Sequence, residues 1–125
     1  MSSKQTISIL GSTGSIGSNT VDVINSNKKK FLVYSLSSKN NVNLLYKQSL
    51  LLKPKIVAIQ NKKKYKDLKN KLFGKKIKIL AGDDGVLEST DNKVDIVVAS
   101  IVGIAGLKPT LNSIKNCSKL CLANK

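Results

Sequence analysis

The stretch ILGSTGSIGSNT, residues 9–20, decides the fold, because three glycines at a spacing of three follow directly on an apolar run. The segment before the glycines, TISIL at residues 6–10, is rich in β-branched residues and predicts a strand. The segment after them, NTVDVI at residues 19–24, has the apolar spacing of a helix. A strand, a glycine turn and a helix in this order present backbone N–H groups to a phosphate.

The glycines form the pattern GxxGxxG, and each has its own expected role. We expect Gly11 to allow the tight turn, Gly14 to let a pyrophosphate approach the backbone, and Gly17 to let the first helix pack closely on the strand. Thr13 and Ser15 would offer hydroxyl and N–H groups to phosphate oxygens at the start of the helix. A mononucleotide P-loop needs a lysine beside its last glycine, and this turn has none, so the pattern favours a dinucleotide.

The rest of the chain alternates apolar segments with helical patterns. Six apolar segments predict strands, mostly buried on both faces, at residues 6–10, 31–36, 55–60, 76–80, 94–100 and 119–123. Four segments predict helices, at residues 15–27, 42–52, 61–73 and 107–116. Val23 and Phe73 are expected on the core side of the first and third helices. The alternation predicts one α/β domain over residues 1–125, a Rossmann-like doubly wound parallel sheet in three α/β/α layers with right-handed crossovers.

All 22 basic residues are lysines, and the net charge is +15. Proteins that read base edges or clamp phosphates bidentately usually keep some arginine, so the composition indicates AT-rich coding rather than a nucleic-acid surface. We therefore expect no nucleic-acid partner, and a solvated face for the lysines of the third helix. A basic nucleic-acid-binding module stays open as an alternative, although only Tyr65 and Phe73 lie among the lysines of residues 62–78.

Two further features bear on location and redox state. The run IVVASIVGIAGL at residues 96–107 is shorter than the roughly 20 residues that span a bilayer. The N-terminus carries no signal-peptide pattern, so we expect a cytoplasmic protein with no membrane partner. Cys117 and Cys121 have neither a redox nor a zinc spacing, and the chain has no histidine. We expect two free thiols in a reducing compartment, with Cys121 in a buried strand.

The segment GDDGVLESTDN at residues 82–92 holds four of the seven acidic residues. Such a cluster can hold a metal ion, or it can cap a short helix and form the turns around it. No histidine and no apolar frame supports a shell of metal ligands here. We favour the helix cap and expect no metal site in this chain.

The end of the second predicted strand bears on the choice of cofactor. An NAD site places Asp or Glu there to accept from the ribose 2′-hydroxyl, but the sequence LSSKNNVNLL, residues 36–45, contains no acidic residue. Lys39 stands in its place, with Ser38, Asn40 and Asn41 around it, and a cation with several donors suits a 2′-phosphate. The pattern favours NADPH. The other interpretation is a polar loop that caps the second helix through Asn40 or Asn41.

Three blocks, GSTGSIG, IVGIAGLKPTL and LANK, resemble the N-terminal NADPH-binding domain of 1-deoxy-D-xylulose 5-phosphate reductoisomerases. The resemblance implies an enzyme of the non-mevalonate isoprenoid pathway that rearranges 1-deoxy-D-xylulose 5-phosphate. Enzymes of this family then reduce the resulting branched aldehyde with NADPH to 2-C-methyl-D-erythritol 4-phosphate. The resemblance also implies a divalent Mg or Mn ion in the catalytic domain, where it would hold the substrate oxygens. The full-length protein is expected to be a homodimer.

The resemblance also assigns site residues. The residues that match the pyrophosphate-binding turn are Thr13, Gly14, Ser15 and Ile16. Asn124 matches an NADPH contact, and Lys125 matches a lysine that reaches the substrate. Where the family often has Gly-Lys-Asn after the second strand, an ungapped register gives Lys39, Asn40 and Asn41, with the lysine one place early.

The chain ends where the family continues into its catalytic domain, so we expect no catalytic residue here. We also expect weak NADPH binding and no activity from these 125 residues alone. The nearest enzymatic alternative is an NADP-dependent semialdehyde or acyl-phosphate reductase. Such a reductase needs a nucleophilic cysteine, and neither Cys117 nor Cys121 has a histidine to activate it.

Overall fold

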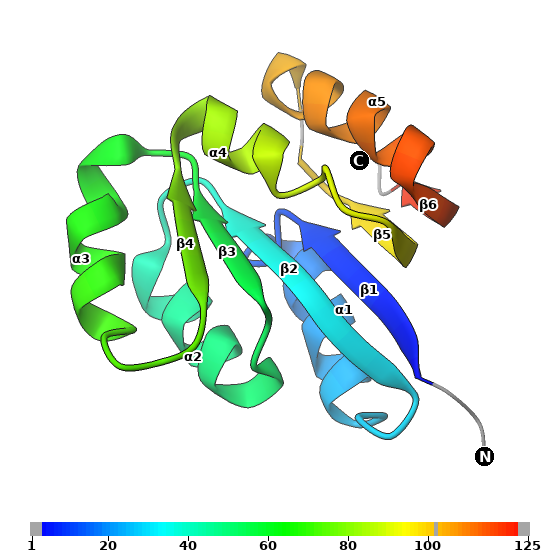
Figure 1. The fold of residues 1–125 in the computed structure, drawn as a ribbon, viewed down its shortest axis with the longest axis horizontal. Helices are drawn as coiled ribbons and strands as arrows, with labels where there is room; N and C mark the ends of the chain where they lie inside the picture. The colour runs from blue at the N-terminus through cyan, green and yellow to red at the C-terminus, as the bar shows by residue number, and fades with distance from the viewer. Residues whose placement is uncertain (1–3, 102, 123–125) are drawn as a thin grey trace.

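The computed structural model describes residues 4–101 and 103–122. Its elements run in the order β1 (Gln5–Leu10), α1 (Ser15–Asn25), β2 (Phe31–Ser38), α2 (Val42–Leu52), β3 (Ile56–Ile59), η1 (Lys62–Lys64), α3 (Tyr65–Lys71), β4 (Lys78–Ala81), α4 (Gly82–Glu88), β5 (Val94–Ala99), η2 (Ile104–Gly106), α5 (Leu107–Asn116) and β6 (Cys117–Leu122). The strands form a six-stranded sheet in the order β4-β3-β2-β1-β5-β6, with every pair parallel (Figure 1). The predicted Rossmann-like doubly wound sheet is confirmed.

The strand order reverses at β1. The chain builds outward from β1 to β4 and then returns to the other side of β1 with β5. The loops that follow β1 and β5 therefore leave the sheet in different directions, which opens a crevice at the carboxyl ends of these strands. The glycine turn lies in this crevice.

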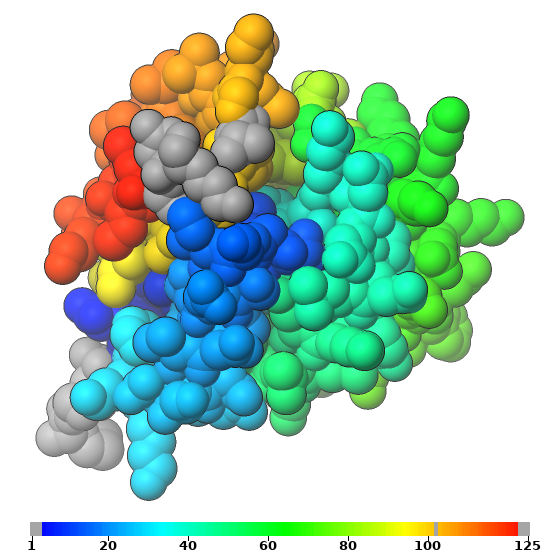
Figure 2. Space-filling view, turned by 180° about the vertical axis from the view of Figure 1, so that it is seen from behind, coloured from blue at the N-terminus to red at the C-terminus, as the bar shows by residue number. Residues whose placement is uncertain are grey.

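Each face of the sheet has its own core. On one face, Val21 of α1, Leu45 of α2 and Leu68 of α3 pack with strand residues such as Ile9. Figure 2 shows this side of the molecule, where residues of α1 and α2 cover the sheet. On the other face, Val86 of α4 packs in a second cluster that includes Leu10. Ile9 and Leu10 are both fully buried because neighbouring residues of a strand point to opposite faces.

The structure corrects three expectations about the core. Val23 is 59% exposed, because it lies two positions from the buried Val21 and so on the opposite side of α1. Phe73 is 88% exposed, because α3 ends at Lys71 and the aromatic ring follows in the turn. Among the described strands β6 lies at the edge of the sheet and pairs with β5 alone, and Cys121 in it is exposed rather than buried.

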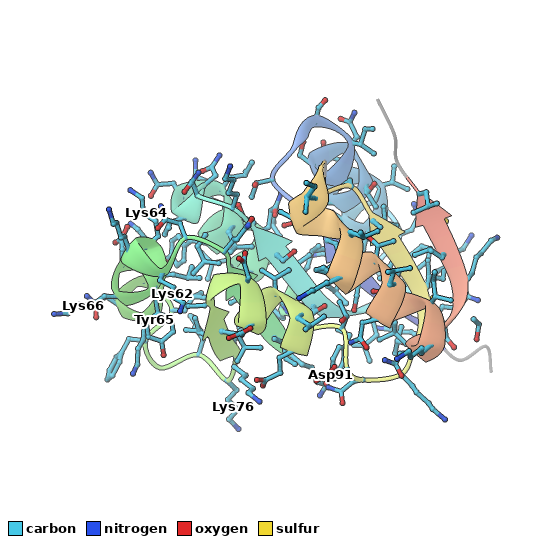
Figure 3. All side chains as sticks on the ribbon, turned by 90° about the horizontal axis from the view of Figure 1, so that it is seen from above. Lys62, Lys64, Tyr65, Lys66, Lys76 and Asp91 are labelled. Atoms are coloured by element: carbon cyan, nitrogen blue, oxygen red, sulfur yellow. The ribbon has the colours of Figure 1, made fainter. Side chains whose placement is uncertain are left out.

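The lysine-rich segment lies on the surface, as expected. The five exposed lysines of η1 and α3 are Lys62, Lys63, Lys64, Lys66 and Lys69. Figure 3 shows Lys64 and Lys66 projecting outward from this part of the molecule. Lys69 Nζ also lies 5.8 Å from the centroid of the Tyr65 ring. Among the described helices, none is long and apolar enough to cross a membrane.

The acidic segment forms the short helix α4, but not through the expected cap. The N-cap of α4 is Ala81, and Asp83 and Asp84 instead occupy the first turn. In the first turn, their negative charges interact favourably with the positive end of the helix dipole. Glu88 forms an exposed ion pair with Lys78 at 3.0 Å, which contributes little to stability. Within residues 4–101 and 103–122, no three His, Cys, Asp or Glu side chains gather as a metal site would require.

Candidate functional site: a dinucleotide crevice

The turn between β1 and α1 is shaped by two of its glycines. Gly11 has a φ of 81°, in the left-handed region that favours glycine. A Cβ on Gly17 would lie 2.0 Å from the carbonyl oxygen of Gly11, so only glycine lets α1 approach the turn this closely. The expected roles of these two glycines, the tight turn and the close packing, are confirmed.

Gly14 is the N-cap of α1, and it leaves the start of the helix open. Among the described residues, no side chain makes a cap hydrogen bond there. The N–H groups of the first helical turn, which include those of Ser15 and Ile16, have no partner within the helix. A Cβ on Gly14 would meet nothing closer than 3.7 Å, so the approach to these N–H groups is unobstructed. This arrangement attracts an anion.

The end of β2 holds the glycine turn in place. The N–H of Gly11 donates to Ser37 Oγ at 3.1 Å, and the N–H of Ser12 donates to the Ser37 carbonyl at 2.8 Å. Thr13 Oγ1 and Ser38 Oγ are 2.6 Å apart and share a hydrogen bond. The Thr13 hydroxyl, expected to face a phosphate, is therefore already bonded to β2.

Two polar residues that the sequence analysis did not single out complete this support. Gln48 of α2 is buried, and its Nε2 donates to the Ser12 carbonyl at 2.8 Å. Ser100, just after β5, donates from Oγ to the carbonyls of Leu10 at 2.8 Å and Gly11 at 3.0 Å. Gln48 could have been found in the sequence, because it is a polar residue on the apolar side of a predicted helix, three positions after Leu45.

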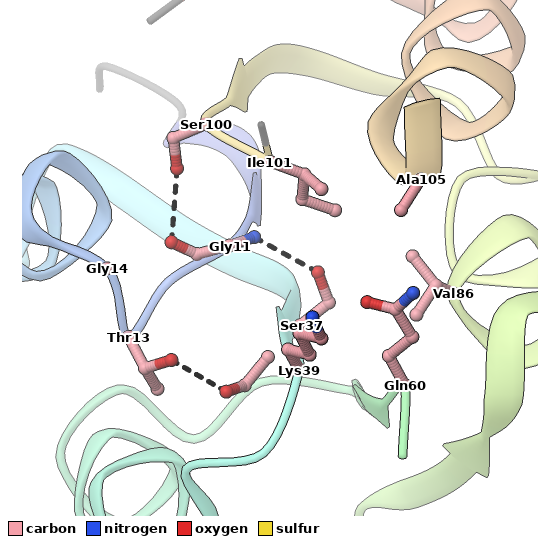
Figure 4. A pocket seen from close by; sticks show the side chains of 11 residues that line it. Gly11, Thr13, Gly14, Ser37, Lys39, Gln60, Val86, Ser100, Ile101 and Ala105 are labelled. Atoms are coloured by element: carbon pink, nitrogen blue, oxygen red, sulfur yellow. Dashed lines mark hydrogen bonds between the residues drawn. The ribbon is translucent and has the colours of Figure 1, made fainter. Parts of the chain in front are cut away.

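A cavity of about 240 Å³ opens at this crevice (Figure 4). Its lining residues are Gly11, Thr13, Gly14, Ser37, Ser38, Lys39, Gln60, Val86, Ser100, Ile101 and Ala105. In Figure 4 the turn and the end of β2 form one side of it, and Val86, Ile101 and Ala105 form an apolar side. Gln60, Val86 and Ala105 also line an adjoining cavity of about 300 Å³ between α4 and α5.

The residues predicted to contact the cofactor at the end of β2 have different surroundings in the structure. Lys39 lines the cavity. Asn41 is the N-cap of α2, where its Oδ1 accepts from the N–H of Leu44 at 3.1 Å, as the helix-capping interpretation expected. Asn40 Oδ1 accepts from Asn61 Nδ2 at 2.8 Å. The predicted contacts at Asn124 and Lys125 lie outside the described residues.

This geometry agrees with comparisons to known proteins. A model of the 1-deoxy-D-xylulose 5-phosphate reductoisomerase family matches residues 7–125. The chain belongs to this family. It is 46% identical over 120 residues to the reductoisomerase of Wolbachia sp. subsp. Brugia malayi, covering 95% of this chain and 31% of the relative. It is 43% identical over 123 residues to that of Phocaeicola vulgatus, covering 98% and 32%.

Solved reductoisomerases have the same fold. The enzyme from Zymomonas mobilis, solved in complex with NADPH, matches with a TM-score of 0.94 and 35% identity. The match covers 98% of this chain and 32% of that one. A reductoisomerase solved with NADPH, fosmidomycin and magnesium matches with a TM-score of 0.88 and 34% identity. The chain thus spans about a third of the length of the reductoisomerases that it matches.

The comparisons give no support to the two alternative functions, and the cysteines argue against the semialdehyde or acyl-phosphate reductase. Neither Cys117 nor Cys121 lines the crevice, and both are free thiols. Cys117 begins β6, at the edge of the parallel sheet opposite the glycine turn. Burial raises the pKa of its thiol and Cys121 raises it further, while a hydrogen bond from the Lys119 backbone acts the other way. A raised pKa lowers the thiolate fraction, so Cys117 is a poor nucleophile.

Proposed function

We propose that residues 1–125 form the NADPH-binding domain of a reductoisomerase and that the crevice holds the dinucleotide. The observation that carries this proposal is the open start of α1 beside a cavity with one polar and one apolar side. The reductoisomerase from Zymomonas mobilis, which has the same fold, was solved with NADPH. The pyrophosphate would bind beside Gly14 at the first-turn N–H groups of Ser15 and Ile16, since the N–H of Gly14 itself donates to the Gly11 carbonyl at 3.3 Å.

The two sides of the cavity suit different parts of the cofactor. Lys39 would face the 2′-phosphate of the adenosine ribose, because its ammonium group is a cation at the position where an NAD site has a carboxylate. Val86, Ile101 and Ala105 would pack against a flat ring of the dinucleotide. Asn40 and Asn41 would act mainly by shaping the loop, since both side-chain oxygens are already bonded. Asn124 and Lys125 stay predicted contacts to NADPH and to the substrate.

The whole protein would convert 1-deoxy-D-xylulose 5-phosphate to 2-C-methyl-D-erythritol 4-phosphate, as a cytoplasmic homodimer. A small-molecule substrate is in keeping with a relative solved with fosmidomycin and magnesium. The described residues offer no cluster of carboxylates or imidazoles for a divalent ion, so they do not fit the metal site. We therefore assign metal binding to the two-thirds of the family's polypeptide that this chain does not match.

A titration of the chain with NADPH and with NADH tests the proposal. We expect tighter binding of NADPH, and Lys39→Ala should weaken NADPH binding about tenfold while leaving NADH binding unchanged. Lys28→Ala is the matched control, since Lys28 is exposed beyond the end of α1 and does not line the crevice. Equal affinity for both dinucleotides would remove the role of Lys39, and no binding of either would overturn the proposal.

A further inference from the structure

The loop that carries Lys39 is held by the loop that follows the next strand, β3. The N–H of Gln60 donates to the Ser38 carbonyl at 2.8 Å. The N–H of Asn61 donates to the Lys39 carbonyl at 2.9 Å. These two bonds continue the pairing of β2 and β3 beyond the ends of both strands, so the backbone at Lys39 has a defined position.

The side chain of Asn61 adds two bonds that only its amide can make together. Its Nδ2 donates to Asn40 Oδ1 at 2.8 Å. Its Oδ1 accepts from the N–H of Lys63 at 3.0 Å and so caps η1. One amide thus ties the residue after Lys39 to the start of the next helical turn.

Within this loop, Lys39 therefore has the one side chain that makes no hydrogen bond to another residue of the described ranges 4–101 and 103–122. Ser38 is bonded to Thr13, Asn40 to Asn61, and Asn41 to the start of α2. The Lys39 side chain is exposed and lines the cavity. A lysine is a point charge on a flexible stem, so its reach toward a phosphate depends on where its backbone is held.

We propose that Asn61 is a positioning residue for the selection of NADPH over NADH, acting through Asn40 on the loop that carries Lys39. The inference rests on the proposed function, because it assumes that Lys39 meets the 2′-phosphate. The backbone bond from residue 61 survives any substitution except proline, so the identity of this residue determines only the two side-chain bonds. Of these two, the bond to Asn40 is the one that reaches the loop with Lys39.

The test compares the ratio of the NADH and NADPH dissociation constants across a set of variants of the full chain. Asn61→Ala removes both side-chain bonds, whereas Asn61→Ser keeps a cap for η1 and cannot reach Asn40. We expect both variants, and Asn40→Ala, to lower the ratio about fivefold, the scale of one exposed hydrogen bond, with NADH affinity unchanged. The double variant of Asn40 and Asn61 should match the single ones, because all three remove the same link.

Asn27→Ala is the matched control, since Asn27 also makes an exposed side-chain bond, to the Val23 carbonyl, at the other end of the molecule. Thermal unfolding confirms that each variant is folded. Equal weakening of both dinucleotides by Asn61→Ala would indicate a structural role only and overturn the inference, as would a wild-type ratio in Asn61→Ser. The proposed function would then still stand. An unaltered chain that binds both dinucleotides equally would remove the role of Lys39 and overturn this inference alone, whereas one that binds neither would overturn the proposed function as well.

Discussion

The glycine-turn region buries polar side chains, whereas the surface of α5 exposes large apolar ones. Around the turn, Ser12, Ser37 and Gln48 are polar and almost completely buried. Along α5 and the residues before it, large apolar side chains are exposed at a spacing of three or four. These are Ile104, Leu107, Leu111 and Ile114, with exposed fractions of 91%, 56%, 53% and 54%. We call these four residues the α5 stripe.

The difference shows what each region depends on. A buried polar group costs free energy unless it is hydrogen-bonded, and Ser12, Ser37 and Gln48 all make bonds to the turn or the end of β2. The turn region is therefore sensitive to single atoms. The α5 stripe is largely in contact with solvent in this chain, so its side chains contribute little burial energy to the fold.

The largest expected change in the free energy of unfolding is for a substitution in the turn region, where alanine at Gly17 and alanine at Gly14 should differ strongly. Gly17→Ala places a methyl group 2.0 Å from a backbone oxygen that cannot move away, so we expect a loss of about 3 kcal/mol or more in the free energy of unfolding. Gly14→Ala has room for the methyl group and a φ of −74°, so it should cost about 1 kcal/mol or less. Urea unfolding measures both.

The same pair separates folding from binding. In Gly14→Ala the methyl group occupies the approach to the first-turn N–H groups, so a folded variant should lose most of its NADPH binding. Full NADPH affinity in Gly14→Ala would contradict the assignment of the pyrophosphate to this turn. Similar unfolding energies for the two variants would contradict the close packing at Gly17.

The next effect concerns the buried amide of Gln48. Gln48→Met keeps the size of the side chain but removes the donor to the Ser12 carbonyl, which stays buried. We expect a loss of about 1–2 kcal/mol in the free energy of unfolding, because the buried Ser12 carbonyl loses its donor. The loss should be toward the lower end of this range, because the substitution also removes Gln48 Oε1, a buried polar atom with no partner among the described residues. Urea unfolding with Gln60→Met as control tests this, since the Gln60 bond to Asp83 is exposed. A loss no larger than in Gln60→Met would show that the turn does not depend on this amide.

The sequence predicted most of the fold because the fold depends on patterns that repeat along the chain. Buried strands such as IVAI in β3 are continuous apolar runs, and the glycine turn has a spacing with few other uses. Errors arose where a pattern ended. Phe73 continued the apolar spacing of its helix, but the helix stopped two residues earlier, and helix ends depend on local capping.

The site was only partly predictable, for a different reason. Gly11 and Gly17 have roles that follow from their own backbone, and these could be anticipated. Ser100 and Asn61 act through residues far from them in sequence, across neighbouring strands, and no single-sequence pattern shows which strands are neighbours. Lys39 lies between these cases, because its charge predicts a contact to the 2′-phosphate, whereas the position of its loop depends on contacts from the loop that follows β3.

A smaller change in the free energy of unfolding is expected for the α5 stripe, where the high exposure of the side chains predicts that polar substitutions are tolerated. Leu111→Gln should change the free energy of unfolding by no more than about 0.5 kcal/mol, because the side chain is already more than half exposed. Leu45→Ala, in the core on α2, should cost about 2–5 kcal/mol in the same urea experiment. A loss above about 1.5 kcal/mol in Leu111→Gln would show that the stripe is packed in solution and that the contrast between the regions is wrong.

The smallest effect separates the two thiols of β6, where Cys117 is half-buried and Cys121 exposed. Burial raises the pKa of Cys117 and so lowers its thiolate fraction at pH 8, and Cys121 is the more exposed thiol, so iodoacetamide should alkylate Cys121 first.

The raised pKa of Cys117 also makes the free energy of unfolding depend on pH. The Cys117 thiol of the unfolded chain loses its proton near pH 8.5, at a lower pH than the thiol of the folded chain. The contribution of this thiol to the free energy of unfolding is therefore complete below that pH and is lost as pH rises through the folded pKa. Cys117→Ala should remove this alkaline slope, while Cys121→Ala should keep most of it, because burial is the larger cause of the raised pKa and Cys121 the smaller. An unchanged slope in Cys117→Ala would mean that another group produces it.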